Sequence, residues 1–339
     1  MSKEYFKQRD KKNMNVVDEH CSTLPQLCTE YFDDISLARA ASTMANYARQ
    51  LSIFFNWVVD NLEFDKPSKD LTADDIASIT TDDITSFLHS LKFVGNSDET
   101  IRAYARAVSA FYSHFVRKNK LKANPVDGVL RPKHKKSPKI YLDDTDNSQF
   151  LDSVTNKTGL TDRQVVYNNT INVGLRDRVI VELLCDTGIR VSELVGLDLK
   201  DIDLNRCRIS VQRKGGNIDL VYFSDDTKDL IVDYMAVRKK IAKSDAFIVS
   251  FVGNNKGNRI SVRSIELLIK KYALASGVTN ADKMTPHKMR HTCAMSLLKA
   301  TGNIALVQKQ LGHKSITSTT VYAEADDSDL ASIRNIRHT

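Results

Sequence analysis

The sequence predicts a mainly helical protein with a small antiparallel β-sheet, divided into two domains. Apolar residues recur at helical intervals of three and four along most of the chain. Two short strand-like runs, 206–212 and 218–223, flank a turn that contains two glycines, which is typical of a β-hairpin. A basic stretch with two prolines, 128–140, interrupts a chain of 339 residues, which is too long for one ordinary core.

The domain boundaries follow from this basic stretch. Residues 1–23 are polar and predict a flexible amino-terminal tail, and residues 24–127 predict a helical domain. The stretch 128–140 holds five lysines and arginines and no acidic residue, so it predicts an extended linker suited to lie against DNA. Residues 141–325 predict a second domain, followed by a tail at 326–339.

Two helices of the first domain have the clearest patterns. The segment 42–61 places apolar residues at helical intervals, with Ser42 or Thr43 as the N-cap. The segment 98–119 carries one apolar stripe behind a capping serine and an acidic first turn. Arg102 and Arg106 lie on its other side, where the simplest reading of a single arginine is a solvated face.

The second domain is predicted to surround its hairpin with helices. The polar stretch 156–174 predicts a loop or a short insertion, and the apolar run within 175–186 predicts a deeply buried helix that stops at Thr187 and Gly188. Further helices are expected at 227–242, 261–275, 286–300, 303–311 and 315–323.

Composition and cysteine usage limit the class of protein. Lys and Arg number 49 against 42 Asp and Glu, a formal net charge of +7, which suits a polyanionic partner but is also common in soluble enzymes. The five cysteines show no C-x-x-C spacing, which argues against a disulfide framework or a zinc ribbon and suits a reducing compartment. The amino terminus is charged, with no apolar stretch of signal or membrane-span length. We therefore expect a cytoplasmic protein without a membrane partner.

Five segments of the second domain contain residues suited to chemistry, although each has a structural explanation on its own. Arg190 could be an exposed arginine at the start of a helix, Lys214 a solvent-facing turn lysine, and Tyr322 a core tyrosine. His287 and His291 are four apart on a predicted helix, but no glutamate or third ligand accompanies them at a zincin spacing, so no metal is predicted. The segments are TGIRVSELVGL, RKGG, TPHKMRHT, LGHKS and TTVYAEA.

In combination these segments resemble the tyrosine recombinase family, with bacterial Xer-type recombinases and mobile-element integrases as the nearest types. The resemblance covers nearly the whole chain and implies a helical, SAM-like core-binding domain followed by a mixed α/β catalytic domain. It maps the family's catalytic set onto Arg190, Lys214, His287, Arg290, His313 and Tyr322. Glu193 matches an acidic residue with a supporting role.

The implied chemistry fits these residue types. Tyr322 attacks a DNA phosphate, and the charge that develops on the non-bridging oxygens is met by Arg190 and Arg290, whose planar guanidiniums donate in pairs. His313 adds a third donor, and His287 is the expected base or proton acceptor.

The implied product is a 3′-phosphotyrosine ester and a free 5′-hydroxyl. Lys214 protonates the departing 5′ oxygen, and the ester preserves the energy of the broken bond for rejoining. No cofactor, metal or ATP is expected.

The resemblance also implies partners. The expected DNA is a duplex with a specific inverted-repeat site, held by both domains, with a homotetramer acting on two duplexes. A paralogous recombinase or a DNA translocase is left open as a further partner, and the tail 326–339 could dock on a neighbouring protomer or pack in cis. The candidate DNA contacts are Thr43, Asn46, Arg49, Arg102, Arg106, Arg131, Lys133, Lys135 and Lys136.

Three other functions remain open at this point. A type IB topoisomerase shares the tyrosine chemistry but relaxes supercoils as a monomer. A DNA-binding regulator could keep the fold without catalysis, and a metal-dependent nuclease could use His287 and His291. For a recombinase, the sequence leaves open chromosome-dimer resolution and the movement of a mobile element.

Overall fold

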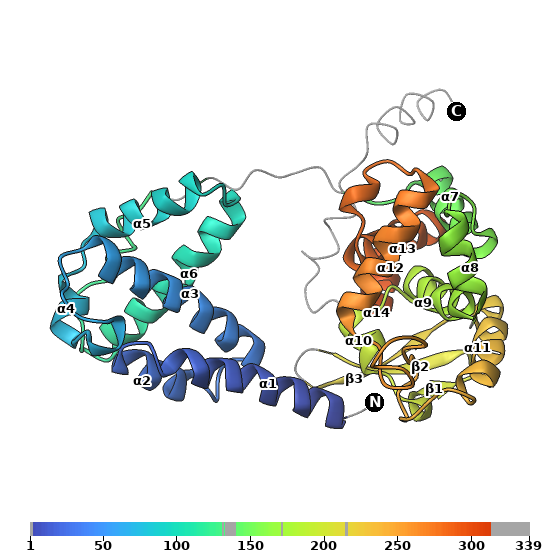
Figure 1. Cartoon of the computed structure of the whole chain (residues 1–339), viewed down its shortest axis with the longest axis horizontal. Coiled ribbons are helices and arrows are strands. Elements are labelled where there is room, and N and C mark those ends of the chain that lie inside the picture. Colours follow the sequence, from blue (N-terminus) through green and yellow to red (C-terminus); the bar gives the residue numbers. More distant parts are fainter. Residues whose placement is uncertain (1–2, 131, 133–139, 171, 214–215, 313–339) are drawn as a thin grey trace. The chain divides into compact units, whose positions relative to one another are not determined.

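The computed structural model describes residues 3–130, 132, 140–170, 172–213 and 216–312 (Figure 1). The chain divides into two compact units, and their boundary falls between Ser137 and Pro138, inside the predicted linker. The described residues are mostly helical, with one three-stranded antiparallel sheet, which confirms the predicted fold class. Among the helices in these ranges, none combines the length and the apolar character needed to cross a bilayer.

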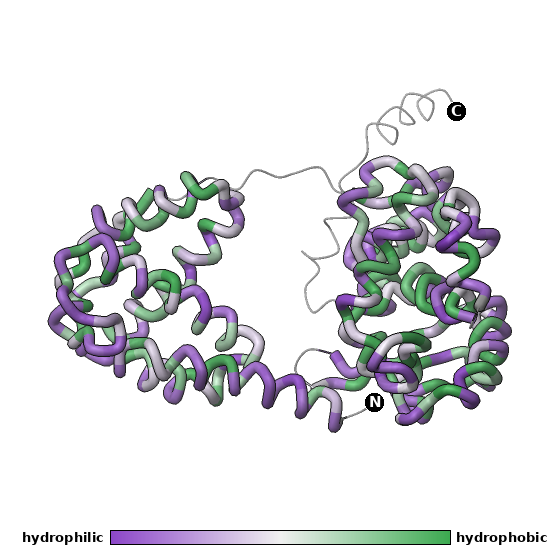
Figure 2. The backbone as a smooth tube through the Cα atoms, in the orientation of Figure 1, coloured by the Kyte–Doolittle hydropathy of each residue, from purple (hydrophilic) through white to green (hydrophobic). Residues whose placement is uncertain are grey.

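The amino-terminal unit packs its helices around aromatic side chains. Phe55 of one long helix and Phe111 of another are fully buried, with ring centroids 5.5 Å apart. Hydrophobic and hydrophilic residues alternate along these helices (Figure 2), as expected where one face covers a core. The helices are α1 (Lys3–Cys21), α2 (Gln26–Ile35), α3 (Ala41–Asn61), α4 (Ala73–Ser78), α5 (Thr81–Phe93) and α6 (Asp98–Arg117), with a 3-10 turn at Ser68–Asp70.

Helix α1 occupies most of the segment for which the sequence predicts a flexible tail. It packs against α3, where Val17 is buried and Met14 and Cys21 are partly buried against the same core. These three residues are spaced by three and four positions and so share one face of a helix. Charged residues lie between these three positions, so the apolar stripe is narrow and the segment is polar in composition. The helix is stable because it packs against α3 rather than because of its composition.

Helix α9 (Val173–Thr187) is central to the carboxy-terminal unit. It packs against α7 (Asp144–Asn156), α8 (Asp162–Thr170), α11 (Asp225–Arg238), α12 (Val262–Ser276) and α13 (Pro286–Thr301). Val179, Ile180 and Leu184 are fully buried, because neighbours cover the helix on several sides. The buried helix predicted for 175–186 is confirmed.

Helix α8 lies within the stretch 156–174, for which a loop or insertion is predicted. Its Asn168 is buried and donates from Nδ2 to the Tyr272 hydroxyl at 2.9 Å. That hydroxyl donates in turn to Asp177 Oδ2 at 3.1 Å. A polar sequence is helical here because its polar groups are satisfied by distant partners.

The sheet consists of β1 (Ile202–Asp203), β2 (Arg208–Gln212) and β3 (Ile218–Tyr222) in sequence order. Gln212 pairs with Ile218 across the predicted hairpin, and the Arg213 N–H donates to the Asn217 carbonyl at 2.7 Å. The remaining elements are α10 (Val191–Gly196), α14 (Ile304–Leu311) and 3-10 turns at Leu199–Asp201 and Ala281–Lys283. The helix predicted at 315–323 lies outside the described residues.

Candidate active site

Arg190 directly precedes α10 and is held by a glutamate one turn into that helix. Its backbone N–H donates to Glu193 Oε2 at 2.8 Å, and its guanidinium Nη1 donates to Glu193 Oε1 at 2.8 Å. The Glu193 side chain is 4% exposed, whereas that of Arg190 is 42% exposed. The carboxylate thus orients an arginine that still reaches solvent, which is the geometry that the supporting role of Glu193 requires.

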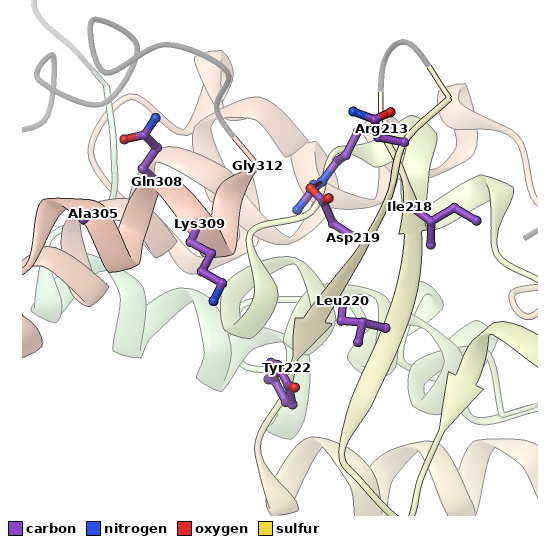
Figure 3. Close-up of a pocket in the computed structure, with 10 residues that line it drawn as sticks. Arg213, Ile218, Asp219, Leu220, Tyr222, Ala305, Gln308, Lys309 and Gly312 are labelled. Atoms are coloured by element: carbon purple, nitrogen blue, oxygen red, sulfur yellow. Dashed lines mark hydrogen bonds and ion pairs between the residues drawn. The ribbon is translucent and has the colours of Figure 1, made fainter.

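Arg213 is a second arginine on the same carboxylate. Its Nη1 donates to Glu193 Oε2 at 2.9 Å, and its Nε donates to Asp219 Oδ2 at 3.0 Å. Figure 3 shows the Arg213 and Asp219 side chains meeting beside a groove of about 610 Å³ between β3 and α14. Sequence reasoning missed Arg213 as a site residue. The signal was present, because Ile209 and Val211 are buried on alternate positions of β2 and Arg213 is next in that period.

Arg290 joins the end of α9 to the end of α14. It is 3% exposed, and it donates from Nη1 to the Gly188 carbonyl and from Nη2 to the Leu311 carbonyl, each at 2.6 Å. Arg290 therefore fixes a buried positive charge between these two chain segments.

His287 lies near both predicted catalytic arginines. Partial burial lowers the pKa of its imidazole, and the positive charges of Lys288, Arg290 and Arg190 lower it further. A neutral ring keeps one nitrogen as an acceptor, as a base requires. His291 lies one turn further along α13, with its Nε2 3.0 Å from that of His287. Within the described ranges, no three His, Cys, Asp or Glu side chains are placed to hold a metal.

Glycine is required where these elements meet. Gly188 ends α9 with φ of +61°, and a Cβ there would lie 2.5 Å from Leu311 Cδ2. Gly312 ends α14 with φ of +65°, and a Cβ there would lie 2.4 Å from Arg213 Nε. Both positions combine the left-handed conformation with a close approach, which only glycine permits.

The structure thus brings together Arg190 and Glu193 from one part of the sequence and His287 and Arg290 from another. Three predicted catalytic residues, Lys214, His313 and Tyr322, lie outside the described residues, and so does the tail 326–339. Along the chain, Lys214 directly follows Arg213 and His313 directly follows Gly312.

The predicted DNA contacts of the amino-terminal unit lie on α3 and α6, which pack against each other. Arg49 donates to Asn46 Oδ1 at 3.2 Å, and both are exposed. Arg102 and Arg106 share Glu99, at 2.5 Å and 3.0 Å. Thr43 is on the same helix as Asn46, one turn earlier. Arg131, Lys133, Lys135 and Lys136 lie outside the described residues.

Comparisons with known proteins identify the family of the chain. Residues 162–329 match the phage integrase family. The tyrosine recombinase XerS of Streptococcus thermophilus is 31% identical over 348 residues, covering 91% of this chain and 94% of that protein.

Two solved structures share the fold. A crystal structure of the XerH site-specific recombinase bound to palindromic difH substrate superposes with a TM-score of 0.69 at 18% identity, covering 96% of this chain and 94% of that one. The Tn1549 transposon integrase in complex with transposon right end DNA gives 0.67 at 21% identity, covering 92% and 99%. These matches do not favour a topoisomerase or a non-catalytic regulator. The chain belongs to the tyrosine recombinase family, also called the phage integrase family, and is a site-specific recombinase.

Proposed function

We propose that this recombinase cuts and rejoins duplex DNA through a 3′-phosphotyrosine intermediate on Tyr322, exchanging strands through a Holliday junction. The observation that carries the proposal is the convergence of Arg190, Glu193, His287 and Arg290 where α9, α10, α13 and α14 meet. Along the chain, Lys214 directly follows Arg213, which binds Glu193. His313 directly follows Gly312 at the end of α14.

Arg190 and Arg290 act on the scissile phosphate in different ways. Arg190, exposed and oriented by Glu193, donates to the non-bridging oxygens of the scissile phosphate. Arg290, which is buried between the ends of α9 and α14, supplies fixed positive charge close to the same phosphate. Fixed donors aimed at developing charge stabilise a transition state more than mobile ones.

Proton transfers complete the reaction. The oxygen of Tyr322 forms a bond to phosphorus while the bond from phosphorus to the 5′ oxygen breaks. The phenolic proton passes to neutral His287, and Lys214 protonates the leaving 5′ oxygen. Attack of another 5′-hydroxyl on the phosphotyrosine reverses these steps, so rejoining needs neither ATP nor a metal.

The DNA partner is proposed to be a duplex with an inverted-repeat site, bound by four protomers on two duplexes. Relatives described as bound to palindromic difH substrate and to transposon right end DNA support such a site. Arg49 and Arg106 on α3 and α6 supply phosphate contacts within a core-binding unit, and 326–339 couples neighbouring protomers. Similarity to XerS proteins supports chromosome-dimer resolution, and similarity to the transposon integrase supports element movement.

The test begins by selecting a duplex from a random-sequence library with the Tyr322→Phe protein. A nicked form of this selected duplex is then incubated in EDTA with wild type, Tyr322→Phe and Tyr167→Phe. Tyr167 is a 47% exposed tyrosine on α8 and serves as the matched control. We expect a denaturation-resistant protein–DNA band with wild type and Tyr167→Phe only.

Other outcomes would contradict the proposal. A band that persists in Tyr322→Phe identifies another nucleophile, and a band that EDTA removes indicates a metal-dependent reaction. The absence of any band on a tightly bound duplex indicates a regulator. Relaxation of a plasmid with two sites, without exchange between them, indicates a topoisomerase.

A further inference from the structure

Arg213 carries more contacts to the site than its position in a hairpin would suggest. Besides Glu193 and Asp219, its Nη2 donates to the Gln310 carbonyl at 3.0 Å. One guanidinium therefore binds α10, β3 and the end of α14. The Arg213 side chain is 4% exposed, so it is covered by protein on nearly all sides.

The first consequence concerns Arg190. Glu193 Oε1 accepts from the Arg190 guanidinium, while Oε2 accepts from both the Arg190 N–H and Arg213 Nη1. A buried carboxylate with a second ion-pair partner is held in one rotamer, because leaving that partner unpaired in the interior is costly. The direction of the Arg190 side chain thus depends on Arg213 through Glu193.

The second consequence concerns the end of α14. Arg213 holds the Gln310 carbonyl, and Arg290 holds the next carbonyl, that of Leu311. Cations at a helix carboxy terminus are favourable because the last carbonyls carry partial negative charge. The close approach of Gly312 to the guanidinium seats the chain directly before His313.

We propose that Arg213 is a positioning residue of the recombinase: it does not touch DNA, and it sets Arg190 and the end of α14 in one fixed arrangement. This inference rests on the proposed role of Arg190 at the phosphate. The exposures separate the two arginines, since Arg190 is 42% exposed and able to reach a ligand, whereas Arg213 is covered.

The chain offers a matched control for a merely structural role. Arg238 is buried to the same extent as Arg213, each at 5% exposure. Its Nε donates to the carbonyls of Ala246 and Phe247 at 3.0 Å. No described contact connects Arg238 to Glu193 or to the end of α14.

The experiment compares Arg213→Lys with Arg238→Lys in the full chain on the nicked selected duplex. Three quantities are measured: the thermal midpoint, the Kd for the duplex, and the single-turnover rate of covalent complex formation at saturating DNA. Lysine keeps the charge, but its compact ammonium lacks the planar, branched geometry with which the guanidinium reaches Glu193, Asp219 and the Gln310 carbonyl. We expect Arg213→Lys to slow cleavage on the order of 10²-fold, as misplacement of a reacting group does, with an unchanged Kd.

Arg238→Lys is expected to lower the thermal midpoint and to leave the rate per bound molecule unchanged. The inference is overturned if, at a temperature where both proteins are folded, Arg213→Lys cleaves as fast as Arg238→Lys. If Arg213→Lys does not fold, Asp219→Asn is measured instead. This substitution weakens the ion pair between Arg213 and Asp219, whose side chain is 41% exposed. A rate at the wild-type level in Asp219→Asn would then overturn it.

A modified substrate distinguishes positioning from general damage. A methylphosphonate at the scissile position replaces one charged non-bridging oxygen with a methyl group, which removes charge that Arg190 is proposed to neutralise. If Arg213 acts through Arg190, the rate deficits of Arg213→Lys and Arg190→Ala both shrink on this substrate. If the rate deficit of Arg190→Ala shrinks on the methylphosphonate substrate while that of Arg213→Lys stays constant, Arg213 does not act through Arg190.

The cleavage rates of Arg190→Ala and Arg213→Lys distinguish a failure of the proposed role of Arg190 from a failure of the positioning role of Arg213. Wild-type cleavage by Arg190→Ala on the unmodified duplex would overturn the proposed role of Arg190 itself. Slow cleavage by Arg190→Ala together with normal cleavage by Arg213→Lys would overturn only the positioning role.

Discussion

Replacing Gly312 with alanine tests the most crowded point of the site. Gly312 has φ of +65°, and an added Cβ would lie 2.4 Å from Nε and 2.6 Å from Cζ of Arg213. Gly302, which ends α13, has a similar φ of +59° but nothing within 4 Å of the added atom. The pair therefore separates the backbone cost of alanine from the cost of the clash.

The expected magnitudes differ by several kcal/mol. A left-handed alanine costs about 1–2 kcal/mol, and this is the whole expected loss for Gly302→Ala. In Gly312→Ala the Cβ displaces a guanidinium from Glu193 and from the Gln310 carbonyl. Breaking a buried ion pair costs about 3–5 kcal/mol, so the loss should exceed that of the control by roughly this amount.

Urea unfolding of the full chain measures both losses. The single tryptophan, Trp57, lies on α3 of the amino-terminal unit, so its fluorescence follows that unit and should be unchanged in both variants. Far-UV circular dichroism reports the loss of helix in both units, so the transition that Trp57 fluorescence does not show is that of the carboxy-terminal unit. Equal destabilisation by the two substitutions would refute the close approach of Gly312 to Arg213.

Three further predictions use the same protein. The single-turnover cleavage rate should fall with decreasing pH as His287 is protonated. Its lowered pKa places the midpoint below the ordinary histidine value of about 6.5, and a midpoint above that value, or an identical profile in His287→Gln, would count against this role. Phe111→Ala empties a fully buried site in the amino-terminal unit and should cost about 3–5 kcal/mol in the Trp57 transition alone, so a loss shared by both transitions would contradict independent units. Arg106→Ala should reduce the slope of log K against log salt for DNA binding by about 0.9, and an unchanged slope would remove Arg106 from the interface.

Periodicity was sufficient for much of the secondary structure. The stripe of α6 corresponds to one buried face, the continuous apolar run of α9 to a helix covered on several sides, and the alternation of β2 to a strand with one buried face. The segments that periodicity missed, α1 and α8, bury few apolar residues. They depend on Val17 packing against α3 and on Asn168 bonding to Tyr272, and neither contact is local in sequence.

The residue types at Arg190, Glu193, His287 and Arg290 were legible in the sequence, because the motifs place guanidiniums, a carboxylate and an imidazole in a recognisable order. Their electrostatic setting was not. The lowered pKa of His287 depends on burial and on the charges of Lys288, Arg290 and Arg190, of which Arg190 is 97 positions away (287 − 190). The carbonyl partners of Arg290 come from the ends of two helices.

Local order along the chain thus carries the fold class, the hairpin and the chemical identity of the site, since helical and strand periods and short motifs are properties of neighbouring residues. Tertiary structure alone decides that Arg213 is an interior residue bound to Glu193, Asp219 and Gln310 rather than a solvated turn arginine. The physical reason is that burial makes a charged group depend on partners from several elements, and only folding brings those elements within hydrogen-bonding distance.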